Sequence, residues 1–275
     1  MNKIIRIYCE GGSGSHDYDI LSKIIEVPVH VNVEIKPIGS VRGAGAIIQD
    51  RESIGPVRSD FKFFFRDRDF DRPIPQNVTL ERDNNRKYWY YSYRNTIENY
   101  LFNISVFFSF LKDNNLCDKY SLPSEDAVKS KFIEAAERIK HYQAVRHAMG
   151  KMRTGDTNFG TRWTEKSGKL PENLDEEYCK NKAWDRIEKA KSIADNWTKE
   201  NFIKCYQGFL ALFDKGFMET LDFFIYFQGK DFASSLTSLL SGFSLNQYYK
   251  FAKIHFDYKQ FPDLVQLRKL IEDNL

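Results

Sequence analysis

The sequence predicts an α/β fold, with a mostly parallel sheet flanked by helices, followed by a mainly α-helical C-terminal region. Two observations predict it. Up to about residue 93, short β-branched and aromatic runs alternate with helical apolar spacing, as in βαβ units. From about residue 100, apolar residues recur at helical intervals with few strand signals. We therefore expect one domain over residues 1–112 and a helical domain over residues 113–275.

The first strand and helix are expected at the N-terminus. Residues Ile4–Tyr8 form a short apolar run typical of a buried strand, and a glycine-rich loop, Glu10–His16, follows it. From His16 or Asp17 to Ile25, apolar residues three and four apart predict a helix. These residues therefore predict a strand, loop and helix unit in which Glu10 begins the loop.

Three further strands are expected in the α/β half. Val29–Ile38 alternates with a period of two, and a short helix over Ala44–Arg51 follows it. Phe61–Phe65 is a second apolar run, and Tyr88–Tyr93 is a tyrosine-rich strand. Parallel sheets place their chemistry at the carboxyl ends of such strands.

Long helices are expected in the C-terminal region. Helical spacing predicts them over Lys129–Met149, Glu176–Asn196, Lys199–Phe213 and Leu264–Asn274. Residues 154–173, with several glycines and a proline, predict a long loop between the first two.

Composition narrows the class of protein. Lys and Arg total 41 against 38 Asp and Glu, so the net charge of +3 does not by itself mark a nucleic-acid binder. The four cysteines form no C-x-x-C pair, which argues against a zinc ribbon and is typical of a reducing compartment. No apolar stretch is long enough to span a bilayer and no signal peptide is visible, so we expect a cytoplasmic protein without a membrane anchor.

Acidic residues follow two of the predicted strands. Glu10 comes after the first strand, and Asp67, Asp69 and Asp71 come after Phe61–Phe65. The carboxyl ends of parallel strands can be neighbours, and alternation puts the three aspartates on one side, so we expect the acids to converge. Clustered carboxylates stay ionised beside a cation, and oxygen-only ligands suit Mg²⁺ or Mn²⁺. The sequence therefore predicts a metal site for phosphoryl chemistry.

Plainer interpretations remain open for these residues. The aspartates could form a solvated charged turn with Arg66, Arg68 and Arg72 as counterions. Asp17 could support the site, or it could be a helix N-cap or first-turn acid. The glycines after Glu10 could aim backbone N–H groups at a phosphate, or they could form a flexible connection.

Basic and aromatic stretches also have two interpretations each. The basic residues of 138–153 could grip a phosphate backbone, although a solvated helix face is favoured. The aromatic residues of Tyr88–Tyr93 could stack on nucleobases, but such a run more often packs into a core. The phenylalanines of Phe107–Phe110 and Phe223–Phe227 favour a core or a dimer surface.

The acidic residues resemble the motifs of the Toprim domain, in which a glutamate follows the first strand and a D-x-D follows a later one. Glu10 with Gly11 is similar to the first motif, and Asp67-Arg68-Asp69 is similar to the second. The segment from Thr96 to Glu98 resembles a third motif of OLD-type Toprim nucleases, in which a hydroxyl residue and a glutamate lie two apart.

A fourth segment narrows the resemblance. Gly229-Lys230-Asp231 resembles a signature of a Toprim subfamily that includes the effector of the PARIS anti-phage system, a nuclease that attacks transfer RNA after release from an ATPase partner. Outside this segment the helical half carries little of the resemblance.

The resemblance implies a magnesium-dependent endonuclease that hydrolyses phosphodiester bonds. Glu10 and Asp67 are then ligands of one Mg²⁺ or Mn²⁺ ion, and Asp69 and Glu98 are ligands of a second. Asp71 is a further candidate ligand, and Lys230 is a candidate for stabilising developing charge on a phosphate. All six residues are hypotheses at this stage.

The resemblance also implies partners. It implies transfer RNA as substrate, an active homodimer, and an ATPase encoded as a separate protein, because the chain has no Walker sequence. Two alternatives remain: an OLD-like DNA endonuclease, and a non-catalytic module that binds a partner ATPase or nucleic acid.

Overall fold

The chain divides into two compact units. The computed structural model describes residues 3–25, 31–39, 48, 60–70, 72–86, 88–152, 170–171, 173–191 and 198–275. The sheet unit is built from Met1–Arg68, Pro75–Tyr93 and Lys253–Leu275, and the helical unit from Asp69–Ile74 and Arg94–Ala252. These units are bounded differently from the expected domains 1–112 and 113–275, because residues 253–275 return to the sheet.

The sheet unit contains five strands in the order β2-β1-β3-β5-β4. Their bounds are β1 Lys3–Cys9, β2 Val31–Pro37, β3 Phe61–Arg66, β4 Glu81–Arg82 and β5 Trp89–Tyr91. β1 lies between β2 and β3 and is parallel to both, β5 is parallel to β3, and only the short edge strand β4 is antiparallel among the described strands. The predicted mostly parallel sheet is therefore confirmed, with each expected strand close to its expected bounds.

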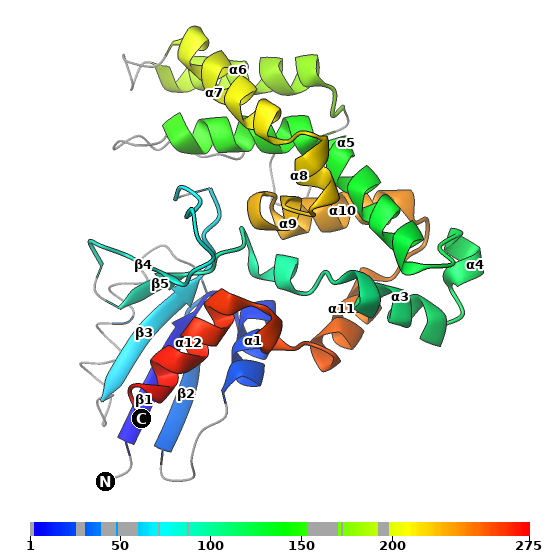
Figure 1. The fold of residues 1–275 in the computed structure, drawn as a ribbon. Coiled ribbons are helices and arrows are strands. Elements are labelled where there is room, and N and C mark those ends of the chain that lie inside the picture. The colour runs from blue at the N-terminus through cyan, green and yellow to red at the C-terminus, as the bar shows by residue number, and fades with distance from the viewer. Residues whose placement is uncertain are drawn as a thin grey trace. The chain divides into compact units, whose positions relative to one another are not determined.

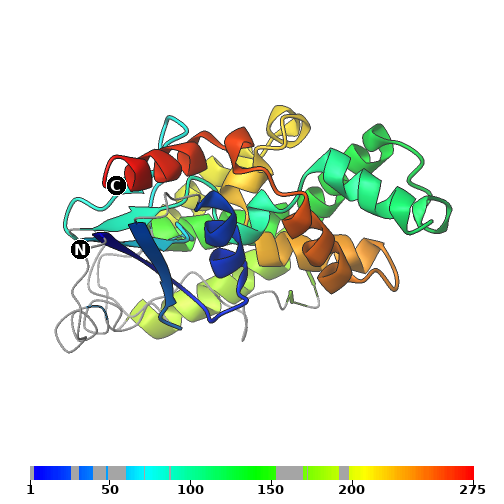
Figure 2. The same cartoon turned by 90° about the horizontal axis from the view of Figure 1, so that it is seen from below.

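Two helices lie beside this sheet. Helix α1, His16–Ile24, buries the apolar face that its spacing predicts, and α12, Pro262–Glu272, is the C-terminal helix. Arg268 donates to the carbonyl oxygen of Ile24 at 3.1 Å, so α12 runs alongside α1 (Figures 1 and 2). Asp263, which is 1 % exposed, accepts a hydrogen bond from the Tyr93 amide at 3.0 Å and ties α12 to the segment after β5.

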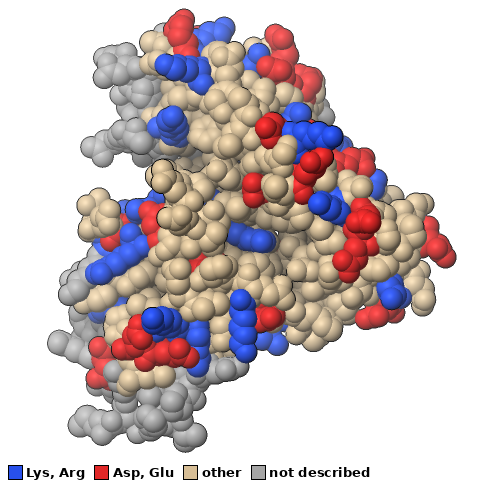
Figure 3. Space-filling model, viewed as in Figure 1, with Lys and Arg blue, Asp and Glu red and all other residues tan. Residues whose placement is uncertain are grey.

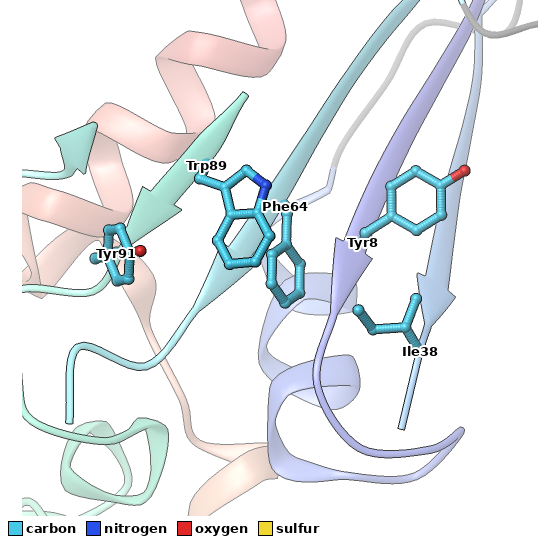
Figure 4. Packing of buried hydrophobic residues seen from close by; sticks show 5 residues of the cluster. All are labelled: Tyr8, Ile38, Phe64, Trp89 and Tyr91. Atoms are coloured by element: carbon cyan, nitrogen blue, oxygen red, sulfur yellow. The ribbon is translucent and has the colours of Figure 1, made fainter. Parts of the chain in front are cut away.

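Aromatic residues fill one face of the sheet. Tyr8 on β1 is in register with Phe64 on β3, and Phe64 is in register with Trp89 on β5. Tyr91 and Ile38 complete the cluster (Figure 4). The rings of Phe64 and Trp89 meet edge to face, with centroids 4.5 Å apart, a favourable arrangement for aromatic pairs. The core interpretation of the tyrosine-rich strand is therefore right for these residues.

The helical unit is built around one long helix, α5. The described elements are η1 Ile97–Tyr100, α3 Ile104–Asp113, α4 Cys117–Tyr120, α5 Glu125–Met152, α6 Glu176–Lys191, α7 Lys199–Leu212, α8 Lys215–Glu219, α9 Phe223–Tyr226, α10 Gly229–Leu239 and α11 Leu245–Ile254. A short 3-10 helix, η2 Tyr258–Gln260, precedes α12 in the sheet unit. Helices α6 and α7 lie along α5 (Figure 1).

Phenylalanines form the core of the helical unit. Phe102 and Phe132 are buried and their rings lie 6.1 Å apart, and Phe232 lies 4.9 Å from Phe102. Phe107 and Phe224 are buried as well, so the core interpretation of both Phe-rich segments is confirmed. No helix in the described part of the chain is long and apolar enough to cross a membrane.

Two expectations fall on residues that are not described. The short helix over Ala44–Arg51 lies outside the described residues apart from Ile48, which is in a helical turn. Most of the expected loop of residues 154–173 lies outside them too.

Candidate functional site

Two of the candidate acids sit at one edge of the sheet. Glu10 directly follows Cys9, the last residue of β1, and Asp67 directly follows Arg66, the last residue of β3. These strands are adjacent and parallel, with Tyr8 opposite Phe64. Both acids therefore lie at the carboxyl edge, where parallel sheets hold their functional groups.

Arg66 links the two acidic positions. Its Nε lies 3.2 Å from Oε1 of Glu10 and donates to the backbone carbonyl oxygen of Asp67 at 3.2 Å. Its guanidinium lies 5.4 Å from the centre of the Tyr91 ring, which holds the buried side chain in place. A charge-assisted contact of this kind fixes the direction of the Glu10 carboxylate.

The loop after Glu10 is an ordered turn. Gly11 has a φ of +74° and exchanges two backbone hydrogen bonds with Gly39, at 3.0 and 2.9 Å. A Cβ on Gly11 would lie 2.7 Å from Cβ of Ser15, so only glycine fits after Glu10. The Ser15 amide donates to the Gly12 carbonyl oxygen at 3.0 Å, so neither this N–H nor that of Gly11 points at a phosphate. The turn positions Glu10.

Asp17 lies near Glu10 but is not a helix cap. Ser15 is the N-cap of α1, and its Oγ accepts from the Tyr18 amide at 3.3 Å. Asp17 follows in the first helical turn and is 9 % exposed. Burial, together with the charges of Asp17 and Glu10, raises the pKa of the Cys9 thiol to about 12. Both acids therefore act electrostatically on the thiol that ends β1.

The solvated-turn interpretation of the aspartates is wrong for two of its three proposed counterions, since Arg66 and Arg68 are buried and only Arg72 is half-exposed. Arg66 is 5 % exposed and Arg68 is fully buried, and Arg68 donates from Nε to the Tyr93 carbonyl oxygen at 3.2 Å. Charged side chains at these positions are held in the fold and are not solvated. Asp71 lies outside the described residues.

In the helical unit, Asp69 is clamped to Asn95. The Asp69 amide donates to the Asn95 carbonyl oxygen at 2.8 Å, and Asn95 Nδ2 donates to the Asp69 carbonyl oxygen at 2.8 Å. Asp69 has a φ of +49°, a conformation that costs energy for a non-glycine residue and that concentrates at functional sites. The predicted simple alternation through this segment therefore stops at Asp69.

The third and fourth motifs of the resemblance meet in the same unit. The Gly229 amide donates to Thr96 Oγ1 at 3.0 Å, and a Cβ on Gly229 would lie 2.8 Å from both Thr96 Oγ1 and Glu98 Cβ. Lys230 Nζ lies 3.5 Å from Glu98 Oε1. Segments 133 residues apart in the chain thus form one contact, and glycine is the residue that permits it.

A buried polar network lies next to this contact, and the sequence did not reveal it. Asp231 is 0 % exposed and accepts from Arg146 at 2.5 Å and from Gln143 at 2.9 Å. Arg146 also donates to Gln228 at 2.6 Å and lies 4.2 Å above the Phe70 ring. The network therefore joins α5 to the first turn of α10 and to the residue after Asp69.

Both interpretations of the basic stretch of α5 are wrong for Arg146 and His147. Arg146 and His147 are 4 % and 6 % exposed, so neither the favoured solvated face nor a phosphate-gripping surface includes them. His147 Nε2 lies 2.9 Å from the Tyr226 carbonyl oxygen and its ring stacks on Phe209. His141 Nδ1 lies 2.8 Å from the Tyr206 hydroxyl. Arg146 and His147 are therefore part of the core, whereas Arg138 and Lys151 are exposed, as the solvated-face interpretation expects.

The candidate acids do not form a complete set of metal ligands among the described residues. No group of three or more His, Cys, Asp or Glu side chains that could hold a metal ion occurs among the described residues. Mg²⁺ is commonly held by one or two carboxylates, with waters and substrate phosphates completing its shell. Glu98 Oε2 is buried and has no hydrogen-bond partner among the described residues, as an oxygen that takes a cation can.

Comparison with known proteins gives no family. No family model matches the chain, and no curated protein matches it. On the face drawn in Figure 3, Lys and Arg side chains are interspersed with Asp and Glu, so this face shows no extended basic stripe. Function must therefore be argued from individual residues.

Proposed function

We propose that this chain is a divalent-metal-dependent endonuclease of the Toprim type that hydrolyses RNA phosphodiester bonds. The observation that carries the proposal is that Glu10 and Asp67 directly follow two adjacent parallel strands, β1 and β3. Oxygen donors at this edge are suited to a hard cation and a phosphate. The Toprim-like fold of this half is part of the proposal.

Each unit contributes one pair of acids. Glu10 and Asp67 of the sheet unit bind one Mg²⁺ or Mn²⁺ ion, and Asp69 and Glu98 of the helical unit bind another, with Asp71 as a further ligand. When bound, an ion at either pair would polarise a phosphate oxygen and stabilise the charge that develops on it. Glu98 supports this assignment best, because it has a buried carboxylate oxygen that no described donor satisfies.

Two basic residues prepare the acids for this role. Arg66 is buried and directs the Glu10 carboxylate, which itself is 26 % exposed and therefore accessible. Lys230 contacts Glu98 across 3.5 Å, and its side chain is 54 % exposed. An exposed ammonium beside a buried acid can move to a phosphate oxygen and stabilise the charge that develops there.

The substrate and setting rest on the resemblance. The contact of Gly229 and Lys230 with Thr96 and Glu98 supports it, since both segments carry motifs of the resemblance and the fold brings them together. On this basis the substrate is transfer RNA, and the chain is the toxic effector of an anti-phage defence system. It acts in the cytoplasm as a homodimer and is held inactive by a separate ATPase.

The test is cleavage of purified transfer RNA and of plasmid DNA with Mg²⁺, Mn²⁺ or EDTA, followed on denaturing gels. We expect metal-dependent fragments from RNA. Glu10→Ala and Asp67→Ala should each lower the rate about a hundredfold or more, because a lost metal ligand removes several kcal/mol of transition-state stabilisation. Glu10→Gln, which keeps an acceptor for Arg66, separates the loss of charge from a loss of folding.

The matched control is Glu34→Gln. Glu34 is also an acid of the sheet unit paired with an arginine, with Arg6 Nε 2.9 Å away, but it lies within β2 and not at the carboxyl edge. This variant should cleave as the wild type does. If the chain cleaves DNA and not RNA, the proposed substrate changes from RNA to DNA. Absence of cleavage of both polymers in the presence of metal would overturn the proposal in favour of a binding module.

A further inference from the structure

Two buried oxygens, one on Asn95 just before η1 and one on Glu98 within η1, have no donor among the described residues. Asn95 is 0 % exposed and Glu98 is 4 % exposed. Asn95 Oδ1 and Glu98 Oε2 have no hydrogen-bond partner in the part of the chain that the structure describes. Burying an unsatisfied acceptor is unfavourable, and burying an uncompensated carboxylate is more so. Something that supplies positive charge or donors belongs at this turn.

The orientation of the Asn95 amide is fixed. Its Nδ2 donates to the Asp69 carbonyl oxygen, so the remaining atom, Oδ1, is the acceptor. The backbone is fixed as well, because the Asp69 amide donates to the Asn95 carbonyl oxygen. Asn95 is therefore held in a fixed position against Asp69, and its Oδ1 has no hydrogen-bond partner among the described residues.

Glu98 is held equally firmly. It lies in the 3-10 turn η1, and Gly229 packs against its Cβ so closely that no larger residue fits. Lys230 reaches only Oε1, from 3.5 Å and from an exposed position, which neutralises the carboxylate weakly. The second oxygen, Oε2, has no hydrogen-bond partner in the part of the chain that the structure describes.

An acceptor oxygen is satisfied by a hydrogen-bond donor or by a cation. Both unsatisfied atoms are oxygens, one from a carboxylate and one from an amide, which is the donor set that hard divalent cations take. We infer that Asn95 is a metal ligand, through Oδ1, for the ion that Asp69 and Glu98 bind. The inference rests on the proposed function and adds a residue to it that no motif contains.

Substitutions of Asn95 distinguish a metal ligand from a residue that only holds Asp69 in place. Asn95→Asp keeps an oxygen and adds charge, but it loses the N–H that holds the Asp69 carbonyl oxygen. Asn95→Ala loses both. If Asn95 acts only as a clamp, the aspartate variant should be as impaired as the alanine variant. If Asn95 is a ligand, the aspartate variant should bind metal at least as tightly as the wild type, because added ligand charge raises affinity.

The experiment is Mn²⁺ binding to the full chain without substrate, measured by electron paramagnetic resonance and calorimetry. We expect two ions in the wild type, one of them weakened about tenfold or more by Asn95→Ala and by Glu98→Gln, and restored by Asn95→Asp. The matched control is Asn114→Ala, because Asn114 Nδ2 also donates to a backbone carbonyl oxygen, that of Phe110, at 2.8 Å. Thermal melting of each variant checks that it is folded.

The outcomes distinguish this inference from the proposed function. Unchanged Mn²⁺ affinity in folded Asn95→Ala, with the wild type binding two ions and cleaving RNA, overturns the role of Asn95 alone. Weakened binding in Asn95→Asp equal to that in Asn95→Ala also overturns it. A wild-type chain that binds no Mn²⁺ overturns the inference together with the proposed metal dependence.

Discussion

The two units hold their candidate acids in opposite ways. In the sheet unit the cation is buried and the acid is accessible, since the side chains of Arg66 and Glu10 are 6 % and 26 % exposed. In the helical unit the acid is buried and the cation is exposed, since Glu98 and Lys230 are 5 % and 54 % exposed. The sheet edge therefore presents a compensated acid to solvent, whereas the helical unit contains a buried acid that still needs positive charge.

The supports behind the acids differ too. At the sheet edge, backbone bonds such as those between Gly11 and Gly39 fix Glu10. Behind Glu98, the support is a network of buried side chains centred on Asp231 and Arg146. Removal of a side chain should therefore disturb the helical site more than the sheet edge.

The largest expected effect is the loss of Asp231. Asp231→Leu leaves the buried Arg146 without its carboxylate, and breaking a buried pair in this way costs about 3–5 kcal/mol. The double variant Arg146→Met with Asp231→Leu should recover most of that stability, because a hydrophobic pair of similar volume replaces the charges. The measurement is urea unfolding of the wild type and the variants.

Hydrogen exchange shows which helices and strands lose stability in Asp231→Leu. With Asp231→Leu, protection should fall in α5 and α10 before it falls in β1 and β3. Equal loss of protection in both units would contradict the view that the network supports the helical unit alone. If the double variant is no more stable than Asp231→Leu alone, the stability lost is not that of an unpaired Arg146. It then lies in the hydrogen bonds that Gln143 and Gln228 make to Asp231 and Arg146.

The next effect compares two glycines. Gly229→Ala should destabilise the chain by about 1–3 kcal/mol and lower RNA cleavage, because the new Cβ would press most closely on Asn99, which is held by hydrogen bonds to the carbonyl oxygens of Phe224 and Phe227. Gly208→Ala is the control, since Gly208 lies in α7 with nothing within 4 Å of the new Cβ. It should stabilise the chain by about 0.5–1 kcal/mol. Differential scanning calorimetry measures both.

Gly11→Ala extends this comparison to the sheet edge. The positive φ and the approach to Ser15 should make it unfavourable by about 1–2 kcal/mol or more. Because this residue adjoins Glu10, RNA cleavage should fall as well. A Gly11→Ala chain with wild-type stability and activity would show that the turn does not position Glu10.

Most of the sheet unit could be predicted from the sequence. The strands β1 and β3 end within one residue of their predicted ends, because each is a mostly apolar run, interrupted only by Arg6 or Lys62, that stops at a charged segment. Glu10 and Asp67 were found because each directly follows such a run. The return of α12 to the sheet was not predicted, since its apolar spacing gives a helix but not the partner on which it packs.

The helical site could be predicted only in part. Glu98 and Lys230 came from the resemblance, but their contact joins segments 132 residues apart, which no local periodicity encodes. Arg146 looked like one member of a basic surface, because its buried partner Asp231 lies 85 residues away. Asn95 carried no signal, since its role depends on a clamp to Asp69 formed by folding.

The smallest expected effect is a pH dependence that belongs to the helical unit. Burial lowers the pKa of His141 below its usual value of 6.5, so the unfolded chain binds this proton more readily than the folded chain. Its contribution to stability is therefore complete above about pH 6.5 and falls as the pH drops toward the lowered pKa. His141→Phe should reduce the loss of Tm between pH 7.5 and 5.5 by about 2 °C or less, because the site is only half-buried. His255→Gln, at an exposed position of the sheet unit, is the control and should leave the pH dependence unchanged. The measurement is calorimetry across this pH range. If His141→Phe and the wild type lose Tm equally as the pH falls, the acid sensitivity does not come from His141 and its contact with Tyr206.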